Sequence, residues 1–170
     1  MGNLTYVTGG IRSGKSRFVL EKCKKYKEIT FIVSAYSCDD EMKERIKKHR
    51  EERPKEWQTI EIESGIIEKV QEIQTDIVVI DCLTLYLSRL LDENPLIKVN
   101  DVLKELNEFL KMIKKKTKQV YIISNEIGMG VIPDNKMSRK FIDILGAANK
   151  YLAEKADESY ILISGKPIRI

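Results

Sequence analysis

The sequence has few of the features that mark a secreted or membrane-bound protein. Its three cysteines in 170 residues are odd in number and widely spaced, so they predict neither a disulfide framework nor a zinc knuckle. No apolar run approaches the roughly 18 residues of a membrane span, and the longest charge-free stretch runs from Met1 to Ile11. No charged segment followed by an apolar one marks a signal peptide. These absences favour a reduced, cytoplasmic protein without membrane insertion.

An excess of one charge is also lacking. The 30 Lys and Arg residues are balanced by 26 Asp and Glu residues, which leaves a formal net charge of +4. The two signs are mixed along the chain, so no basic tail or stripe argues for a nucleic-acid partner. With 42% hydrophobic and 33% charged residues, the chain can form a core and is not simply disordered. A length of 170 residues without repeats or linkers predicts one domain over residues 1–170.

Short apolar runs alternate with amphipathic runs along the whole chain. The expected strands are Leu4–Thr8, Ile29–Ala35, Gln58–Ile62, Asp76–Asp81, Gln119–Ser124, Tyr160–Ser164 and a short edge strand at Pro167–Ile170. The expected helices are Lys15–Tyr26, Asp39–Arg53, Ile66–Ile73, Leu83–Leu91, Val99–Lys116 and Lys136–Ala156. Strands that are apolar on both faces and alternate with helices predict an α/β fold. We expect a mostly parallel sheet with helices on both faces.

The segment after the first expected strand satisfies the phosphate-loop pattern G-x-x-x-x-G-K-[ST]. Small residues let the backbone curl until several N–H groups point at one phosphate, and the helix N-terminus adds partial positive charge. Lys15 is expected to neutralise the β- and γ-phosphates, and the Ser16 hydroxyl to bind Mg²⁺. A glycine turn before a helix, the simpler interpretation, does not explain Lys15 and Ser16. The motif predicts a P-loop NTPase-like fold whose nucleotide-binding loop is Gly9, Gly10, Ile11, Arg12, Ser13, Gly14, Lys15 and Ser16.

A phosphate loop usually works with a carboxylate at the end of a neighbouring strand. Asp81 ends the apolar run that begins at Asp76, and ligands collect at this edge of a parallel sheet. Asp81 is therefore a second expected Mg²⁺ ligand, with a helix N-cap as the alternative role. The guanine-reading motif Asn/Thr-Lys-x-Asp is absent, since residues 135–138 lack its carboxylate.

The chain contains a single histidine, His49. On a helix, Arg45, His49 and Arg53 fall on one face at i, i+4 and i+8, and Lys48 and Arg50 flank the histidine. Surrounding cations disfavour a further positive charge, so the imidazole should stay neutral near pH 7 and act as a nucleophile. The same cations would hold polyphosphate oxygens. From the residues alone, a solvated histidine on a charged helix is an equally open interpretation.

Several blocks of the sequence share the order and spacing of one enzyme family. These blocks are residues 9–17, residues 39–61 around His49 and Trp57, residues 81–85, and residues 124–149, followed by Gly165 and Pro167. Together they resemble the bifunctional adenosylcobinamide kinase/adenosylcobinamide-phosphate guanylyltransferases. The resemblance spans nearly the whole chain, and its C-terminal block is more specific than the phosphate loop. Small departures, such as Tyr86 where tryptophan is common, do not involve the reacting atoms.

The resemblance implies an enzyme that assembles the nucleotide loop of cobalamin. Such an enzyme phosphorylates the aminopropanol hydroxyl of adenosylcobinamide, with ATP or GTP and Mg²⁺, and then transfers GMP from GTP to give adenosylcobinamide-GDP. A covalent histidine–GMP intermediate forms in the family, and the matching position is His49. The family assembles as a trimer, so a homotrimer is expected.

The resemblance also implies further site residues. Those expected to bind nucleotide outside the phosphate loop are Ser34, Ala35, Tyr36, Arg50, Glu51, Glu52, Arg53, Glu61 and Asp81. Asn125 and Glu126 are expected on the substrate side, where a strand runs into a loop with two glycines. An ordinary strand-to-helix loop is the alternative there. Two other functions stay open: a small-molecule P-loop kinase in which His49 is a surface residue, and a nucleotide-binding regulatory module without turnover.

Overall fold

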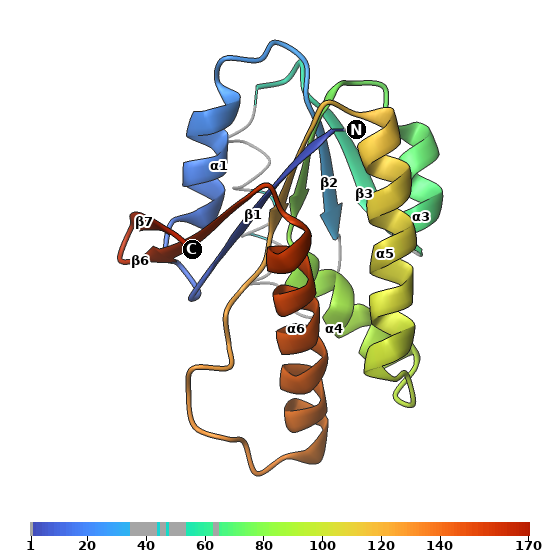
Figure 1. Cartoon of the computed structure of the whole chain (residues 1–170), viewed down its shortest axis with the longest axis vertical. Helices are drawn as coiled ribbons and strands as arrows, with labels where there is room; N and C mark the ends of the chain where they lie inside the picture. Colours follow the sequence, from blue (N-terminus) through green and yellow to red (C-terminus); the bar gives the residue numbers. More distant parts are fainter. Residues whose placement is uncertain (1, 35–43, 45–46, 48–53, 63–64) are drawn as a thin grey trace.

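The strands of the described residues form one sheet with the order β3-β2-β4-β5-β1-β6-β7 (Figure 1). The structure, a computed structural model, describes residues 2–34, 44, 47, 54–62 and 65–170. The strands are β1 (Asn3–Gly9), β2 (Thr30–Ser34), β3 (Gln58–Ile62), β4 (Ile77–Asp81), β5 (Gln119–Ile123), β6 (Glu158–Ile163) and β7 (Lys166–Arg169). Neighbouring strands are parallel except β6 and β7, which are antiparallel. The mostly parallel sheet expected from the sequence is confirmed.

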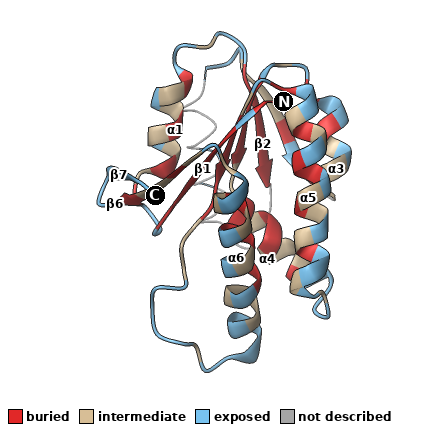
Figure 2. Ribbon diagram, viewed as in Figure 1, coloured by how far each residue is buried: buried red, intermediate tan, exposed pale blue. Residues whose placement is uncertain are grey.

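Helices cover both faces of this sheet. They are α1 (Lys15–Cys23), α3 (Ile66–Lys69) with the 3-10 turn η1 (Val70–Glu72), α4 (Leu83–Glu93), α5 (Val99–Lys116) and α6 (Lys136–Lys155). Successive strand residues point to opposite faces, so Val78 and Ile80 join the core under α3, α4, α5 and α6. Ile77 and Val79 join the core under α1. Figure 2 shows the strands as the buried layer between these helices.

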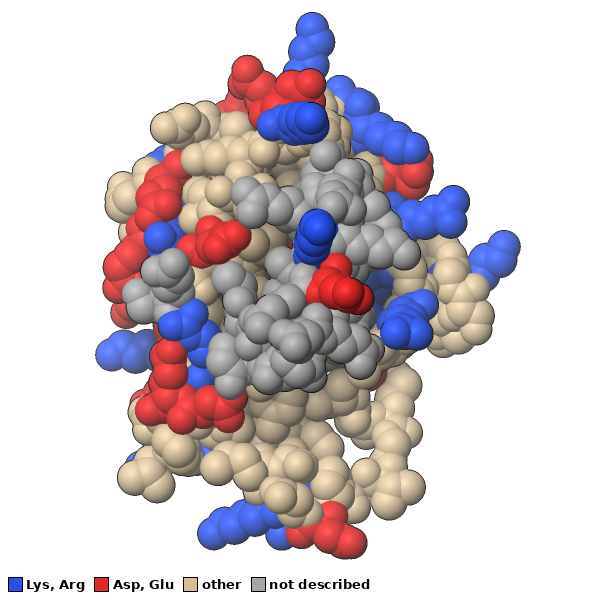
Figure 3. All heavy atoms as spheres, turned by 180° about the vertical axis from the view of Figure 1, so that it is seen from behind, with Lys and Arg blue, Asp and Glu red and all other residues tan. Residues whose placement is uncertain are grey.

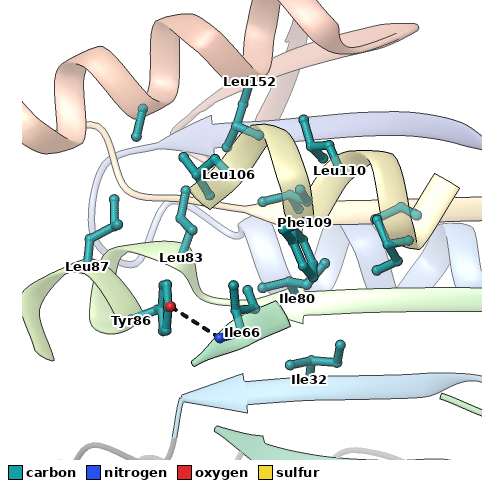
Figure 4. Packing of buried hydrophobic residues seen from close by; sticks show 14 of the residues in the cluster. Ile32, Ile66, Ile80, Leu83, Tyr86, Leu87, Leu106, Phe109, Leu110 and Leu152 are labelled. Carbon is teal, nitrogen blue, oxygen red and sulfur yellow. Dashed lines mark hydrogen bonds between the residues drawn. The ribbon is translucent and has the colours of Figure 1, made fainter. Parts of the chain in front are cut away.

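In the core under α3, α4, α5 and α6, side chains pack three of these helices against the sheet and against one another (Figure 4). Its centre contains Leu83 from α4, Phe109 from α5 and Leu152 from α6, each at most 1% exposed. Burying each such side chain contributes about 1.5–3 kcal/mol. Tyr86 adds two directional interactions to this apolar core. Its hydroxyl accepts a hydrogen bond from the Ile66 N–H at 3.2 Å and donates one to Glu105. That single side chain links α3, α4 and α5.

The observed boundaries differ from the expected ones in a few places. The expected helix Lys15–Tyr26 ends at Cys23, after which Tyr26 N–H bonds to the Cys23 carbonyl in a turn. The expected helix Ile66–Ile73 is a short α-helix that tightens into a 3-10 turn. Strand β6 starts at Glu158, before its apolar run, because Glu158 pairs with Thr5 of β1. The expected helix Asp39–Arg53 falls mostly outside the described residues.

The described surface carries both signs of charge. Seen from behind in Figure 3, lysine, arginine, aspartate and glutamate side chains all lie on this face of the molecule. Within the part of the chain that the structure describes, no helix combines the length and the apolar character needed to cross a membrane.

Candidate nucleotide site

The carboxyl ends of the parallel strands bring those expected site residues that the structure describes to one edge of the sheet. One row of paired residues crosses this edge from β3 to β1: Glu61, Val33, Asp81, Ile123 and Val7. Residues paired in register on parallel strands point to the same face, so the Glu61 and Asp81 side chains lie on the α1 face. The phosphate loop begins at Gly9, directly after this row. The topology therefore places the loop and the Asp81 carboxylate at the edge where α/β proteins bind ligands.

Left-handed backbone shapes the phosphate loop. Gly9 has φ 144° and Gly14 has φ 94°, and even Arg12 takes φ 59°. At Gly9 an added Cβ would lie 2.5 Å from the Leu162 carbonyl oxygen, so a side chain cannot fit between the loop and β6. The loop is also fixed to the β6–β7 turn, because the Gly165 N–H donates to the Ser13 carbonyl at 3.1 Å. Glycine at position 9 is thus required by both conformation and space.

Lys15 is buried beneath this loop at the start of α1. Its side chain is 7% exposed, and its Nζ donates hydrogen bonds to the carbonyl oxygens of Gly9 at 3.0 Å and Gly10 at 2.6 Å. These two carbonyls hold the ammonium group in place. A buried cation whose position is already fixed can stabilise phosphate charge without first being reorganised.

The pKa of Cys82, directly after β4, responds to the charges of both Lys15 and Asp81. Burial, and secondarily the Asp81 carboxylate, raise the pKa of the Cys82 thiol to about 11, while the Lys15 ammonium lowers it. The field of both groups therefore reaches the same thiol. Although the Cys82 side chain keeps some exposed surface, dense surrounding protein keeps it protonated near pH 7. Cys82 is therefore a poor candidate nucleophile.

Asp81 does not cap the following helix. The N-cap of α4 is Cys82, and the Asp81 carboxylate makes no capping hydrogen bond to it. The helix-cap alternative for Asp81 is thus not supported. Its carboxylate and the Ser16 hydroxyl are oxygen donors of the kind that Mg²⁺ prefers, and Mg²⁺ usually takes only one or two protein ligands together with phosphate and water. Such a site needs no larger metal cluster, and among the described residues no group of three or more His, Cys, Asp and Glu is arranged to hold a metal ion.

Buried hydroxyls without partners collect near the loop. Among the described residues, four buried hydroxyl oxygens have no hydrogen-bond partner: those of Tyr6 and Thr8 on β1, Ser13 within the loop and Ser34 at the end of β2. An unsatisfied buried hydroxyl costs about 1–3 kcal/mol, so it is informative where several occur at one edge of a sheet. Their position fits a site whose polar ligand supplies the missing partners. Thr8 was not among the residues expected, although a polar residue ending an apolar strand is a visible signal.

The segment after β5 lies against the phosphate loop. The Glu126 N–H donates to the Gly9 carbonyl at 2.9 Å, and the Glu126 carboxylate accepts from the Gly128 N–H at 2.8 Å. The Asn125 N–H donates to the Thr84 hydroxyl at 2.7 Å. Asn125 and Glu126 therefore adjoin the loop, and their expected place on the substrate side stays a prediction. Thr84, which the sequence did not single out, holds them to the first turn of α4.

The other expected residues fall into two groups. Ser34 is buried at the end of β2, and Glu61 is exposed on β3. The remaining ones lie outside the described residues: Ala35, Tyr36, His49, Arg50, Glu51, Glu52 and Arg53.

Known structures share this architecture. A KaiC-like protein from the hyperthermophilic archaeon Pyrococcus horikoshii superposes with a TM-score of 0.53 at 16% identity, covering 94% of this chain and 72% of that one. This likeness supports the P-loop NTPase-like fold that the loop motif predicts.

Known sequences identify the family. A bifunctional adenosylcobalamin biosynthesis protein, CobU, of Escherichia coli is 31% identical over 176 residues, covering 96% of this chain and 97% of that protein. CobU of Salmonella typhimurium is 30% identical, covering 96% and 97%, and CobP of Pseudomonas aeruginosa is 29% identical, covering 95% and 94%. The family model for cobinamide kinase / cobinamide phosphate guanyltransferase matches residues 5–170. The chain belongs to the cobinamide kinase / cobinamide phosphate guanyltransferase family.

Proposed function

We propose that the chain phosphorylates adenosylcobinamide and then transfers GMP from GTP to adenosylcobinamide phosphate, giving adenosylcobinamide-GDP. The observation that carries the proposal is the buried Lys15 ammonium, held on the Gly9 and Gly10 carbonyls at the head of α1, in a chain of this family. Its Escherichia coli and Salmonella relatives are bifunctional by name.

In the kinase step, the aminopropanol hydroxyl oxygen attacks the γ-phosphorus of ATP or GTP. The bond from that phosphorus to the bridging oxygen breaks, the nucleoside diphosphate leaves, and the hydroxyl proton is released. Lys15 and the N–H groups of residues 9–16 hold the phosphates, and Ser16 and Asp81 would hold Mg²⁺, which neutralises phosphate charge when bound. Asn125 and Glu126 adjoin the loop through the Gly9 carbonyl, and we assign them to the substrate side.

In the second step, the neutral imidazole of His49 attacks the α-phosphorus of GTP. A nitrogen–phosphorus bond forms, the bond to the β-phosphate oxygen breaks, and pyrophosphate leaves. A phosphate oxygen of adenosylcobinamide phosphate then attacks the same α-phosphorus and releases His49. Support comes from the cations at Arg45, Lys48 and Arg50 in the sequence, which favour a neutral imidazole and would bind the triphosphate.

Glu61 is better suited to the nucleoside end of GTP than to its phosphates. Strands β3 and β1 are four strand spacings apart in the sheet order, which is about 19 Å. A carboxylate that far from the phosphate loop can reach the ribose or base of a nucleotide anchored there. Ser34, Ala35, Tyr36 and the segment 50–53 complete the proposed nucleotide site.

We also propose a homotrimer that works in the cytoplasm, where ATP and GTP are available. The loop before α6 supports subunit contact, because Met129, Val131 and Ile132 are 78%, 94% and 77% exposed. Apolar side chains exposed together on one loop commonly mark an interface. Light scattering that reports a monomer at micromolar concentration would remove this part of the proposal.

Incubation with α-labelled GTP tests the function. The proposed enzyme should acquire an acid-labile, base-stable label and pass it to adenosylcobinamide phosphate. An ordinary P-loop kinase would phosphorylate adenosylcobinamide without retaining label. A regulatory module would bind nucleotide without either reaction.

A further inference from the structure

A buried polar network lies behind the segment that follows β5. Asn149 of α6 is 6% exposed and Ser124 is fully buried. The Ser124 hydroxyl donates to Asn149 Oδ1 at 2.7 Å, and Asn149 Nδ2 donates to the Asn125 carbonyl oxygen at 3.0 Å. Both ends of the Asn149 amide are therefore used, and its orientation is fixed by the partner that each end requires.

Thr84 completes the network from α4. Its hydroxyl oxygen accepts from the Asn125 N–H at 2.7 Å and lies 3.3 Å from the Ser124 hydroxyl oxygen. Because the Ser124 proton is directed to Asn149, the Thr84 proton is left to bond Ser124. Side chains from two helices thus hold both backbone polar groups of Asn125.

The network leads directly to the phosphate loop through one peptide group. The Asn125 carbonyl and the Glu126 N–H belong to the same peptide bond. That carbonyl accepts from Asn149, and that N–H donates to the Gly9 carbonyl at 2.9 Å. The Gly9 carbonyl is also the acceptor for Lys15 Nζ at 3.0 Å. The orientation of this peptide plane therefore sets the direction of one of the hydrogen bonds that the Gly9 carbonyl accepts.

We propose that Asn149 is a positioning residue for phosphoryl transfer: by orienting the Asn125–Glu126 peptide, it fixes the phosphate loop and Lys15 against the end of β5. This inference rests on the proposed kinase reaction at Lys15. When a phosphate draws Lys15 away from the Gly9 carbonyl, the Glu126 N–H remains to hold that carbonyl in place. Lys15 can then leave the Gly9 carbonyl for a phosphate while the loop keeps its shape. Preorganised catalysis requires such a fixed loop.

Asn149→Asp is a nearly isosteric test. It keeps the acceptor for Ser124 but replaces the donor to the Asn125 carbonyl with a carboxylate oxygen. We expect kcat for phosphorylation of adenosylcobinamide to fall up to about 100-fold, as small misplacements near reacting groups do, with a smaller change in KM for the nucleotide. The fold should persist, since every other core contact is retained.

The pH profile separates positioning from loss of packing. A buried carboxyl has a raised pKa, and its protonated form again offers a donor to the Asn125 carbonyl. The ratio of variant to wild-type kcat should therefore rise as pH falls from about 9 to about 5. Tyr6, whose pKa is raised by burial, and Glu126, which interacts electrostatically with it, are present in both proteins, so a pH effect that they cause alone also appears in the wild-type profile. Asn149→Leu, which cannot regain a donor, should show no recovery.

Tyr151→Phe is the matched control on the same helix. It removes the hydrogen bond from the Tyr151 hydroxyl to Asn107 Oδ1, 2.9 Å long, which links α6 to α5 away from the loop. It should lower thermal stability without changing kcat. A kcat ratio for Asn149→Asp that stays near 1, or a loss that is independent of pH and matched by Tyr151→Phe, would overturn the inference.

A second variant keeps the inference testable if Asn149→Asp does not fold. Thr84→Val preserves shape while removing the acceptor of the Asn125 N–H, so it should also lower kcat. If folded Thr84→Val retains wild-type kcat, the network does not position the loop. Absence of kinase activity in the wild-type protein would instead refute the proposed function, so the two failures are distinguishable.

Discussion

Glu61 and Asp81 lie in one cross-strand row, each paired with Val33 of the strand between them. Two strand spacings separate them, about 10 Å, and both side chains face the α1 side of the sheet. Asp81 is on the side nearer the phosphate loop and Glu61 is on the outer edge. In the proposed function, Asp81 would therefore bind on the phosphate side of one nucleotide and Glu61 on its nucleoside side.

This division predicts different kinetics for two neutralising substitutions. Glu61→Gln should raise the KM for GTP in guanylyl transfer by about 10-fold, the loss expected for one charged hydrogen bond, and leave kcat for the ATP-dependent kinase reaction unchanged. Asp81→Asn should lower kinase kcat and raise the Mg²⁺ concentration needed for half-maximal rate. Initial rates with varied GTP, ATP and Mg²⁺ measure both effects. Identical profiles for the two variants would contradict the division.

Lys15→Ala should reduce adenosylcobinamide phosphorylation by more than about 100-fold, because a fixed charge that stabilises the transition state is lost. Lys22→Ala is the control on the same helix, since Lys22 Nζ lies 5.2 Å from the Phe18 ring centroid rather than in the loop. It should keep wild-type turnover. Near-normal turnover in Lys15→Ala would refute the phosphate-loop assignment.

His49→Ala should abolish the GMP label and guanylyl transfer while kinase activity remains measurable. The test is clean because His49 is the only histidine in the sequence, so a histidine phosphoramidate can form nowhere else. Peptide mapping of protein treated with α-labelled GTP locates the adduct. A stable label on any other residue type in the wild-type protein would rule out His49 as the nucleophile.

Cys82 offers a reporter of the electric field at the site. Since the Asp81 carboxylate raises and the Lys15 ammonium lowers the pKa of this thiol, Asp81→Asn should speed its alkylation at pH 8 and Lys15→Ala should slow it. The thiolate is the reacting form, so each rate follows the change in pKa. Mass spectrometry of the Cys82 peptide gives the rates.

Cys23 is the internal control for that experiment. Burial raises the pKa of Cys23 to about 12, and Lys25 lowers it; neither Lys15 nor Asp81 contributes. Its alkylation rate should be the same in all three proteins. Parallel changes at both cysteines would indicate loosening of the fold instead of an altered field.

Strands and the phosphate loop could be predicted from the sequence, because they depend on hydrophobic periodicity and on a local motif. Apolar runs located every described strand to within a few residues, and the G-K-S pattern located the loop before α1. The carboxyl edge followed from parallel strands, which brought Asp81 near the loop without any knowledge of contacts.

Partners far apart in the sequence were not predictable in this way. Nothing local indicates that Asn149 reaches the Asn125 carbonyl across 24 positions, or that Leu162 packs against Gly9. An asparagine on an amphipathic helix is ordinarily a surface residue, and only the packing of α6 against the sheet buries this one. The Tyr86 hydroxyl likewise finds Ile66 and Glu105 because three helices converge.

The reversed strand β7 has a consequence for how the protein behaves at high concentration. All four of its residues are exposed, and it forms one outer border of the sheet. Pro167 has no N–H to offer a further strand, and Lys166 and Arg169 place like charges where a second copy would have to approach. This border is therefore protected against edge-to-edge growth into filaments, and a Pro167→Val, Lys166→Thr double substitution would remove that protection.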